Sequence, residues 1–388
     1  MSNFIFPVGY IKMHKVKIMD FQLNRWYSFG YARLEDMKEA AERIRGLADW
    51  KNEMVRQAEK ALAENRIVNA TFYYRAAEFF THPSDPDKKV LYEKFKDLFY
   101  NKAFAGRNIE RFKIPYLSSF LPAIRISSKN KKARGAIVIH GGFDSYMEEF
   151  YSFGHYFSDL GYDVFLFEGP GQGAALKEYG FPLIYQWEIP VKAVLDYFDL
   201  NDVTLLGISM GGWLCFRAAA YEPRIKRVIA SSIAYDYMKI PPGYIENFAR
   251  WLLKHPKIME PAARFKMKIM PQENWGAVNL TYITKKDNSP IEASKVVLEF
   301  NSENLKSELV KQDVLILTGA EDHFIPLKMH YMQVNALKNA RSVTDRIFTR
   351  EEQGQNHCQV GNIGLALNVM SEWIGKKDFV KYEENQHI

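Results

Sequence analysis

The sequence has only two cysteines, Cys215 and Cys358, among its 388 residues. Two cysteines form neither a disulfide framework nor the paired spacing of a structural zinc site, so we expect no metal. No apolar run approaches the roughly 18 residues of a membrane-spanning helix. The N-terminus has a short apolar patch but lacks a charged start and a cleavage site, so no signal peptide is expected. These absences favour a reduced cytoplasmic location and exclude a membrane span.

Charge of one sign is not concentrated in any segment either. The formal net charge of +6 arises from 52 Lys and Arg against 46 Asp and Glu, spread along the chain. The Lys-rich stretch 129–135 is typical of a solvated loop, so we expect no nucleic-acid partner. The glycine-rich stretch 167–177 lacks the spacing of a phosphate-binding loop and of a dinucleotide-binding turn. We therefore expect no nucleotide and no cofactor, and we interpret 167–177 as a turn lining the rim of a site.

The N-terminal part of the chain is predicted to be helical. Four segments repeat apolar residues at three- and four-residue steps and are separated by Gly, Asn or Pro, namely RLEDMKEAAERIRG, LADWKNEMVRQAEKALAEN, RIVNATFYYRAAEFFTH and DPDKKVLYEKFKDLFYNKAF. These segments predict an N-terminal helical domain over residues 1–109.

From about residue 110 the pattern changes to strands that alternate with helices. Unbroken apolar runs such as GAIVIH and DVLILTG are typical of buried strands, and amphipathic segments lie between them. This alternation predicts a mostly parallel, doubly wound sheet covered on both faces, in a domain over 110–388. It pauses at about 233–311, an aromatic- and Met-rich stretch between two strands, which we interpret as a lid insertion.

The stretch LLGISMGGWL places Ser209 between a predicted strand and a predicted helix. It matches G-x-S-x-G in the context that a nucleophile elbow requires, with Gly207 and Gly211 where the two backbones crowd the serine. The alternative is a tight turn that merely contains a serine. In an elbow, the N–H of Met210 is one of two donors that stabilise an oxyanion.

The second donor is expected from the loop HGGFDS, which follows the strand GAIVIH. The two glycines allow the backbone to turn its N–H groups inward, so Gly142 or Phe143 is the predicted donor. We interpret His140 as a structural residue that orients the loop. Ser145 and Glu148 have the spacing of a capping box for the next helix.

An acid is expected after a later strand, and DVLILTGAEDHFIP ends in a polar turn that contains Glu321 and Asp322. We predict Asp322 as the acid that would orient the base and stabilise its charged form. The alternative is that these carboxylates only solvate a loop.

The base is expected last along the chain, and His357 is the predicted base. It lies in the loop EEQGQNHCQVGN, after the last predicted strand and before the last helix. The other downstream histidines are less suitable, because one adjoins the acid, one lies within a helix and one lies in the C-terminal tail (His323, His330 and His387). The order Ser209, Asp322, His357 is the order that this architecture requires.

With these motifs the chain resembles the α/β-hydrolase superfamily from about residue 110 to its end. HGGFDS, FEGPGQG, GISMGG, LTGAEDHFIP and GQNHCQVGN together resemble a subgroup with an N-terminal helical domain. That subgroup includes 2,6-dihydroxypseudooxynicotine hydrolase, FrsA-like esterases and acylaminoacyl-peptidase-like proteins. The resemblance implies an α/β-hydrolase fold whose active-site mouth is covered by the helices. Glu168 stands where the subgroup usually has Asp before GPGQG.

The motifs predict a serine hydrolase that cleaves an ester or amide-like carbonyl of a small-molecule substrate through an acyl-enzyme. An apolar or aromatic substrate is favoured by the aromatic and Met residues of the insertion, among them Tyr235 and Trp251. The candidate pocket residues are Tyr235, Asp236, Glu246 and Trp251. Carbon–carbon bond hydrolysis is the first alternative, with Asp236 or Glu246 as an added acid or base. A non-catalytic binding protein on the same scaffold is the second, and a homodimer stays open.

Overall fold

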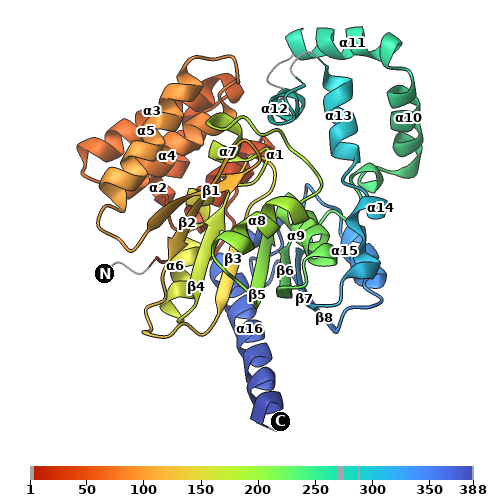
Figure 1. The fold of residues 1–388 in the computed structure, drawn as a ribbon. Helices are drawn as coiled ribbons and strands as arrows, with labels where there is room; N and C mark the ends of the chain where they lie inside the picture. Colours follow the sequence, from red (N-terminus) through yellow and green to blue (C-terminus); the bar gives the residue numbers. More distant parts are fainter. Residues whose placement is uncertain (1–3, 270–274, 287–288, 387–388) are drawn as a thin grey trace. The chain divides into compact units, whose positions relative to one another are not determined.

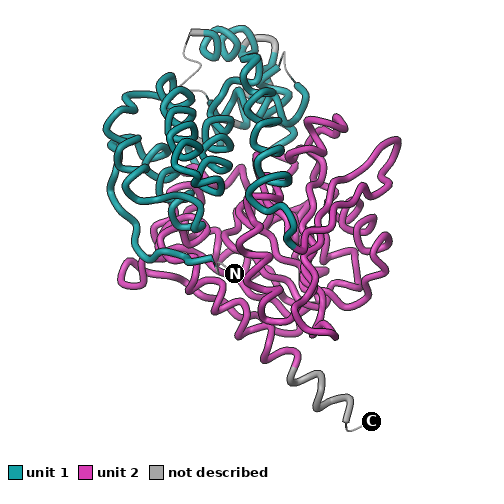
Figure 2. Tube along the Cα trace, turned by 90° about the vertical axis from the view of Figure 1, so that its left-hand side faces the viewer, with its two compact units in different colours: residues 1–107, 243–297 teal, residues 108–242, 298–388 magenta. Residues whose placement is uncertain are grey.

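The computed structural model describes residues 4–269, 275–286 and 289–386. It divides into two compact units, which Figure 2 shows in different colours. One unit comprises 1–107 and 243–297, and the other comprises 108–242 and 298–388. Within the described ranges, no helix is both long enough and apolar enough to cross a membrane.

The second unit is built on a sheet whose strands, among the described residues, follow the order β1-β2-β4-β3-β5-β6-β7-β8 (Figure 1). Pairing is antiparallel from β1 to β2 and from β2 to β4, and parallel everywhere else. The strands are β1 (Glu110–Tyr116), β2 (Ser119–Ile126), β3 (Ala136–His140), β4 (Asp163–Phe167), β5 (Val203–Ile208), β6 (Ile225–Ser231), β7 (Asp313–Gly319) and β8 (Ser342–Phe348). All residues of β5 and β7 are buried, as their unbroken apolar runs predict.

Helices cover both faces of this sheet, because each parallel connection crosses over one face. On one side α8 packs against α9 and β1, and α9 packs on β5 and β6. On the other side α6 packs on β4, and α16 contacts both α6 and β7. This arrangement confirms the predicted mostly parallel, doubly wound α/β fold. The helices of the unit are η2 (Met147–Phe150), α6 (Tyr151–Asp159), α7 (Gly173–Lys177), α8 (Glu188–Tyr197), α9 (Met210–Tyr221), η3 (Tyr237–Lys239), α14 (Ser302–Leu305), η4 (Ser307–Leu309), α15 (Lys328–Ala336), η5 (His357–Gln359) and α16 (Ile363–Gln386).

The strand order changes direction at β3, and this positions a site. The chain passes from β3 to β4 on one side and then returns to β5 on the other. In open α/β sheets, ligands bind outside the carboxyl ends of the strands at such a switch point. His140, the last residue of β3, is paired with Gly207 of β5. The loops after β3 and β5 therefore leave the sheet side by side.

The first unit is helical, and its helices come from both of its sequence segments, 1–107 and 243–297. It holds α1 (Lys17–Ser28), α2 (Leu34–Arg43), α3 (Leu47–Ala63), α4 (Ile67–Phe80), α5 (Asp87–Leu98), the π-helix η1 (Phe99–Ala103), α10 (Gly243–Lys254), α11 (Pro256–Ile269), α12 (Trp275–Ile283) and α13 (Pro290–Leu298). Helix α4 is the centre of the N-terminal bundle, because every side chain from Ala70 to Phe80 is buried and α3 and α5 pack against it.

Aromatic contacts join the insertion helices to the N-terminal helices inside this unit. Trp275, at the start of α12, stacks on Phe79 with 5.0 Å between ring centroids. The same indole meets Phe80 edge-on, also at 5.0 Å. Aromatic pairs at such distances add to the stabilisation that comes from buried area.

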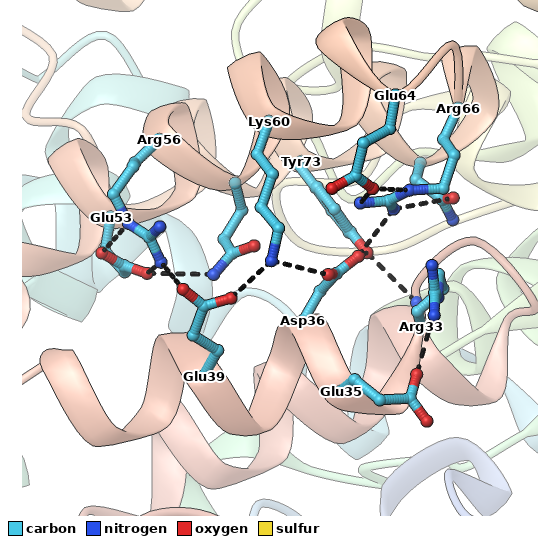
Figure 3. Close-up of polar contacts among 12 residues, drawn as sticks. Arg33, Glu35, Asp36, Glu39, Glu53, Arg56, Lys60, Glu64, Arg66 and Tyr73 are labelled. Carbon is cyan, nitrogen blue, oxygen red and sulfur yellow. Dashed lines mark hydrogen bonds and ion pairs between the residues drawn. The ribbon is translucent and has the colours of Figure 1, made fainter.

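A polar network links α2, α3 and α4 (Figure 3). Glu39 accepts hydrogen bonds of 2.7 Å from both Lys60 and Arg56, and these two contacts lower the pKa of its carboxyl to about 2. Deeper in the bundle, the buried Asp36 accepts hydrogen bonds of 2.7 Å from the Tyr73 hydroxyl and from Arg66. Burial and the nearby Asp36 both raise the pKa of Tyr73, so the phenol stays protonated and donates.

We expect Asp36→Ala to lower the free energy of unfolding by about 3 kcal/mol, because it leaves the buried Tyr73 phenol without its acceptor and removes one acceptor of the half-buried Arg66 guanidinium. Tyr73→Phe removes two hydrogen bonds, the one donated to Asp36 and the one accepted from the Arg33 N–H, and should cost about 1–3 kcal/mol. Urea denaturation measures both. Glu35→Ala is the matched control on the same helix, since Glu35 forms an exposed ion pair with Arg33, and it should change stability by less than about 0.5 kcal/mol. Equal losses for Asp36→Ala and Glu35→Ala would contradict the assignment.

Candidate active site

Ser209 lies at the turn between β5 and α9, in a strained backbone conformation with φ 63° and ψ −125°. A non-glycine residue adopts this region only where the surroundings impose it, as in a strand-to-helix elbow. The turn is tight because a Cβ on Gly207 would lie 1.9 Å from the Gly211 carbonyl oxygen. Ser209 is half-buried and directly follows the carboxyl end of β5. The N–H of Met210 lies in the first turn of α9, where backbone donors have no partner inside the helix.

The loop after β3 packs directly against this elbow. A Cβ on Gly142 would lie 2.6 Å from the Met210 nitrogen, so only glycine allows the loop to approach so closely. The Gly142 N–H is already engaged, since it donates to the Ser145 Oγ at 3.0 Å. Of the two predicted second donors, Phe143 is thus the one whose N–H is not used by Ser145.

The predicted capping box of Ser145 and Glu148 is wrong. The residue that precedes the helical turn η2 is Tyr146, and no side chain caps that turn. The Ser145 hydroxyl instead accepts the Gly142 N–H three residues earlier, which folds the loop back on itself. His140 is buried, with its Nδ1 3.0 Å from the Gly141 carbonyl oxygen, and burial lowers its pKa to about 4. A neutral histidine held in this way matches the structural interpretation.

Asp322 follows β7 and carries its charge in the interior of the unit. Its Oδ1 accepts the N–H groups of Phe324 and Ile325, each at 2.9 Å, and its Oδ2 faces His357 at 2.6 Å. Burial works against the charged form, yet the opposite charge and hydrogen bonds of His357 outweigh it and lower the pKa of Asp322. Glu321, the neighbouring alternative, points away and forms an ion pair with Arg350 on the exposed surface. The structure therefore places Asp322 beside the histidine.

His357, in the turn η5 after β8, joins the acid to the serine. Its Nδ1 lies 2.6 Å from Asp322 Oδ2, and its Nε2 lies 2.8 Å from Ser209 Oγ. Burial lowers the pKa of the imidazole, but the Asp322 carboxylate overcomes this effect and holds the pKa well above its ordinary value of 6.5. The Phe324 ring meets the imidazole edge-on at 5.0 Å. The three side chains form one continuous chain of hydrogen bonds.

Ser232, which sequence reasoning did not single out, is part of this arrangement. Its hydroxyl donates to Asp322 Oδ2 at 3.2 Å and accepts the Cys358 N–H at 3.0 Å. Its backbone has φ 64°, and its N–H donates to the Leu317 carbonyl in β7. The signal available in the sequence was the polar pair that ends the buried strand β6. Ser232 thus connects the loop that bears the acid to the loop that bears the base.

The predicted pocket residues are divided between the two units. Tyr235 packs against a cluster formed by Ala234, Ile325 and Met329, in the unit that holds Ser209. Asp236 is buried, and its carboxylate accepts hydrogen bonds from Met238 N–H and from Ser302.

The other two lie on α10 of the helical unit. There Glu246 accepts hydrogen bonds from Arg250 on the same helix. The Trp251 ring stacks on Phe248 at 6.2 Å and is about half exposed. Among the described residues, no group of three or more His, Cys, Asp and Glu side chains is arranged to hold a metal ion.

A family model described as alpha/beta hydrolase fold matches residues 136–346 of the chain. The hydrolase LUC6 of Fusarium sp is 24% identical over 401 residues, which cover 95% of this chain and 91% of that relative. The hydrolase acrC of Aspergillus aculeatus is 30% identical over 53% of this chain, and the match spans 55% of that relative's length. The 20-hydroxy-prefusarin hydrolase FUS2 of Gibberella moniliformis is 33% identical, over 45% of this chain and 46% of that relative.

Solved structures share the fold over most of the chain. The crystal structure of the 2,6-dihydroxy-pseudo-oxynicotine hydrolase superposes with a TM-score of 0.64 at 19% identity, covering 90% of this chain and 94% of that one. The AbyA5 wild-type structure superposes with a TM-score of 0.63 at 16% identity, covering 85% of each chain. At these identities the likeness establishes the fold.

We expect Ser232→Ala to lower the free energy of unfolding by about 1–3 kcal/mol, because it leaves the buried Cys358 N–H unpaired and removes one donor from Asp322. Chemical denaturation measures the loss. Ser118→Ala, at the exposed turn between β1 and β2 of the same unit, is the control and should be neutral within about 0.5 kcal/mol. A neutral Ser232→Ala would show that the hydroxyl does not support the acid.

Proposed function

The chain belongs to the α/β-hydrolase family, and we propose that within this family it is a serine hydrolase acting through an acyl-enzyme. The observation that carries the proposal is the hydrogen-bond chain from Asp322 through His357 to Ser209, with distances of 2.6 and 2.8 Å. A binding protein on this scaffold has no need of all three groups in this geometry. The strained backbone of Ser209 supports the same assignment, since strain of this kind is retained at functional sites.

In the proposed reaction His357 Nε2 takes the proton of Ser209 as the Oγ attacks the substrate carbonyl. The resulting tetrahedral intermediate carries its negative charge on the former carbonyl oxygen. When that intermediate collapses, the bond to the leaving group breaks and His357 returns the proton to that group. His357 then takes a proton from water as its oxygen attacks the acyl carbon, the bond from that carbon to Ser209 Oγ breaks, and the imidazole returns the proton to Oγ as the acid leaves. Asp322 keeps the imidazole in the tautomer and orientation that both steps need.

The proposed oxyanion site consists of the N–H groups of Met210 and Phe143. Met210 lies at the N-terminus of α9, where the helix dipole also favours negative charge. Phe143 is preferred over Gly142 because the Gly142 N–H donates to Ser145. Donors fixed before the reaction stabilise a developing oxyanion without reorganisation, which is their main contribution to the rate.

We also propose an ester or amide-like carbonyl substrate of small to medium size and apolar or aromatic character. The segment 1–109 would serve as a cap domain and the insertion 233–311 as a lid. The exposed Trp251 and Phe248 rings on α10 supply aromatic surface that suits such a substrate. Carbon–carbon bond hydrolysis is the second candidate, since it is the first alternative that the sequence motifs leave open. Asp236 and Glu246 are then the carboxylates to test beside the leaving carbon.

We expect a fluorophosphonate probe to label the wild-type protein at a single serine, and Ser209→Ala to abolish labelling. The reason is that only a serine with an adjacent base is nucleophilic enough to react at neutral pH. Intact-mass spectrometry measures the adduct. Wild type that fails to label, or Ser209→Ala that labels equally, would refute the nucleophile.

A panel of p-nitrophenyl esters, β-diketones and aminoacyl amides separates the two candidate reactions, and turnover of the diketones alone would favour carbon–carbon cleavage.

The raised pKa of His357 predicts the pH dependence of kcat/KM on a p-nitrophenyl ester. The base must be neutral to accept a proton, so activity should fall as the pH drops through a pKa above 6.5. Asp322→Asn removes the charge that raises this pKa, so it should move the acidic limb to lower pH and reduce kcat by about 10³- to 10⁴-fold. Glu321→Gln is the matched control beside it and should change neither. A limb that moves in Glu321→Gln instead would reassign the acid.

A further inference from the structure

The glycine-rich loop after β4 carries a buried glutamine whose contacts go beyond forming a turn. Gln172 immediately precedes α7 and is 1% exposed. Strand β4 lies beside β3 in the sheet, so the loops that follow them are neighbours at the carboxyl edge. The loop after β3 is the one that presents Gly142 and Phe143.

The Gln172 carboxamide bridges the two loops. Its Nε2 donates to the Gly141 carbonyl at 2.7 Å and to the Gly142 carbonyl at 3.1 Å. Its Oε1 accepts the N–H of Gly169, in its own loop, at 3.0 Å. Two acceptors on one side and a donor on the other define the orientation of the amide, because the nitrogen can only donate and the oxygen can only accept.

From these contacts we infer that Gln172 is a positioning residue that sets the direction of the Phe143 N–H. The carbonyl of Gly142 and the N–H of Phe143 belong to one planar trans peptide group, in which they point in opposite directions. A hydrogen bond that holds this carbonyl toward Gln172 therefore turns the Phe143 N–H away from Gln172. The inference rests on the proposed function, because Phe143 matters to the chemistry only as an oxyanion donor.

Gln172 can direct the loop because its own backbone is held in place. Glu168, at the start of the loop, is buried and accepts the Ala174 N–H at 2.6 Å and the Met147 N–H at 3.0 Å. Met147 lies just beyond the loop that follows β3. Glu168 therefore holds the C-terminal end of this loop, while Gln172 holds its N-terminal end at Gly141 and Gly142. Glu168 stands where the subgroup usually has Asp, and it makes both contacts.

The same loop packs too closely for other side chains at its glycines. A Cβ on Gly169 would lie 2.3 Å from the Trp187 ring. The backbone next to Gln172 therefore has little conformational freedom. The carboxamide is held in place by Gly169 and from there binds the carbonyls of the loop after β3. Gly141 and Gly142 lack side chains that would restrict their backbone torsions, so hydrogen bonds such as those from Gln172 determine the direction of their carbonyls.

The test is Gln172→Met in the full-length enzyme, because methionine keeps the length of the side chain and removes its donors and acceptor. We expect kcat for a p-nitrophenyl ester to fall about 10- to 100-fold, less than the 10²- to 10³-fold loss of an oxyanion donor itself. KM should stay within about threefold. The inhibition constant of a trifluoromethyl ketone, whose adduct carries the oxyanion, should rise by the factor by which kcat/KM falls.

Gln312→Met is the matched control. Gln312 is also buried, donates from Nε2 to the Ala219 carbonyl at 2.8 Å and accepts the Lys311 N–H, but it lies at the opposite end of the sheet, before β7. Gln312→Met should lose about as much thermal stability as Gln172→Met, but it should keep the wild-type kcat and inhibition constant. Should Gln172→Met fail to fold, Gln172→Glu replaces it, since it keeps the shape and the acceptor and loses both N–H donors.

A crystal structure of the variant supplies a readout that does not depend on activity. A Gly142–Phe143 peptide that turns away from its wild-type direction supports the inference, and an unchanged peptide overturns it. Unchanged kcat and inhibition, or changes that only match those of Gln312→Met, overturn it as well. Wild-type enzyme that takes up no fluorophosphonate would refute the proposed function, and the direction of the peptide would still decide the role of Gln172.

Discussion

The buried negative charge of Asp322 is the constraint that determines how the loops at the carboxyl edge of the sheet are arranged. An unpaired carboxylate in this position would be costly, so the surrounding loops supply donors from several strands. The Phe324 and Ile325 N–H groups come from its own loop, the Ser232 hydroxyl from the end of β6, and the imidazole of His357 from beyond β8. The charge orders these loops, and the ordered imidazole reaches the serine. Stability and chemistry therefore depend on the same hydrogen bonds.

The other side of the elbow has a complementary arrangement built from backbone groups. The loops that carry Asp322 and His357 place ionisable side chains on one side of the serine. The loops after β3 and β4, on the other side, present peptide N–H and C=O groups. Gly142 packs on the first turn of α9, while Gln172 holds the carbonyls of the same loop. Ser209 lies between the two sides in its strained conformation. The switch in strand order at β3 creates this division, because it brings loops from two different crossovers to one serine.

Much of the α/β unit could be predicted, since buried strands and amphipathic helices leave local periodic patterns. The family match and the observed sheet confirm that fold. Choices between adjacent residues were harder. Neighbours in a turn point in different directions, so Asp322 turns to the imidazole and Glu321 to Arg350 in solvent. The capping box failed for a related reason, because the Ser145 hydroxyl accepts the Gly142 N–H instead of capping η2. The spacing of a motif does not determine which of two hydrogen-bond partners a hydroxyl takes.

The sequence by itself determined the elements of the α/β unit and the elbow at Ser209, because hydrophobic period and steric crowding at glycines act within a few residues. Only the tertiary structure decided which distant groups meet. Gln172 reaches a loop about thirty residues away, and Ser232 contacts residues about ninety and more away, because strand order makes them neighbours. It also assigned residues 243–297 to the helical unit, where Trp275 packs on Phe79 and Phe80. Such partners depend on topology, which no local pattern encodes.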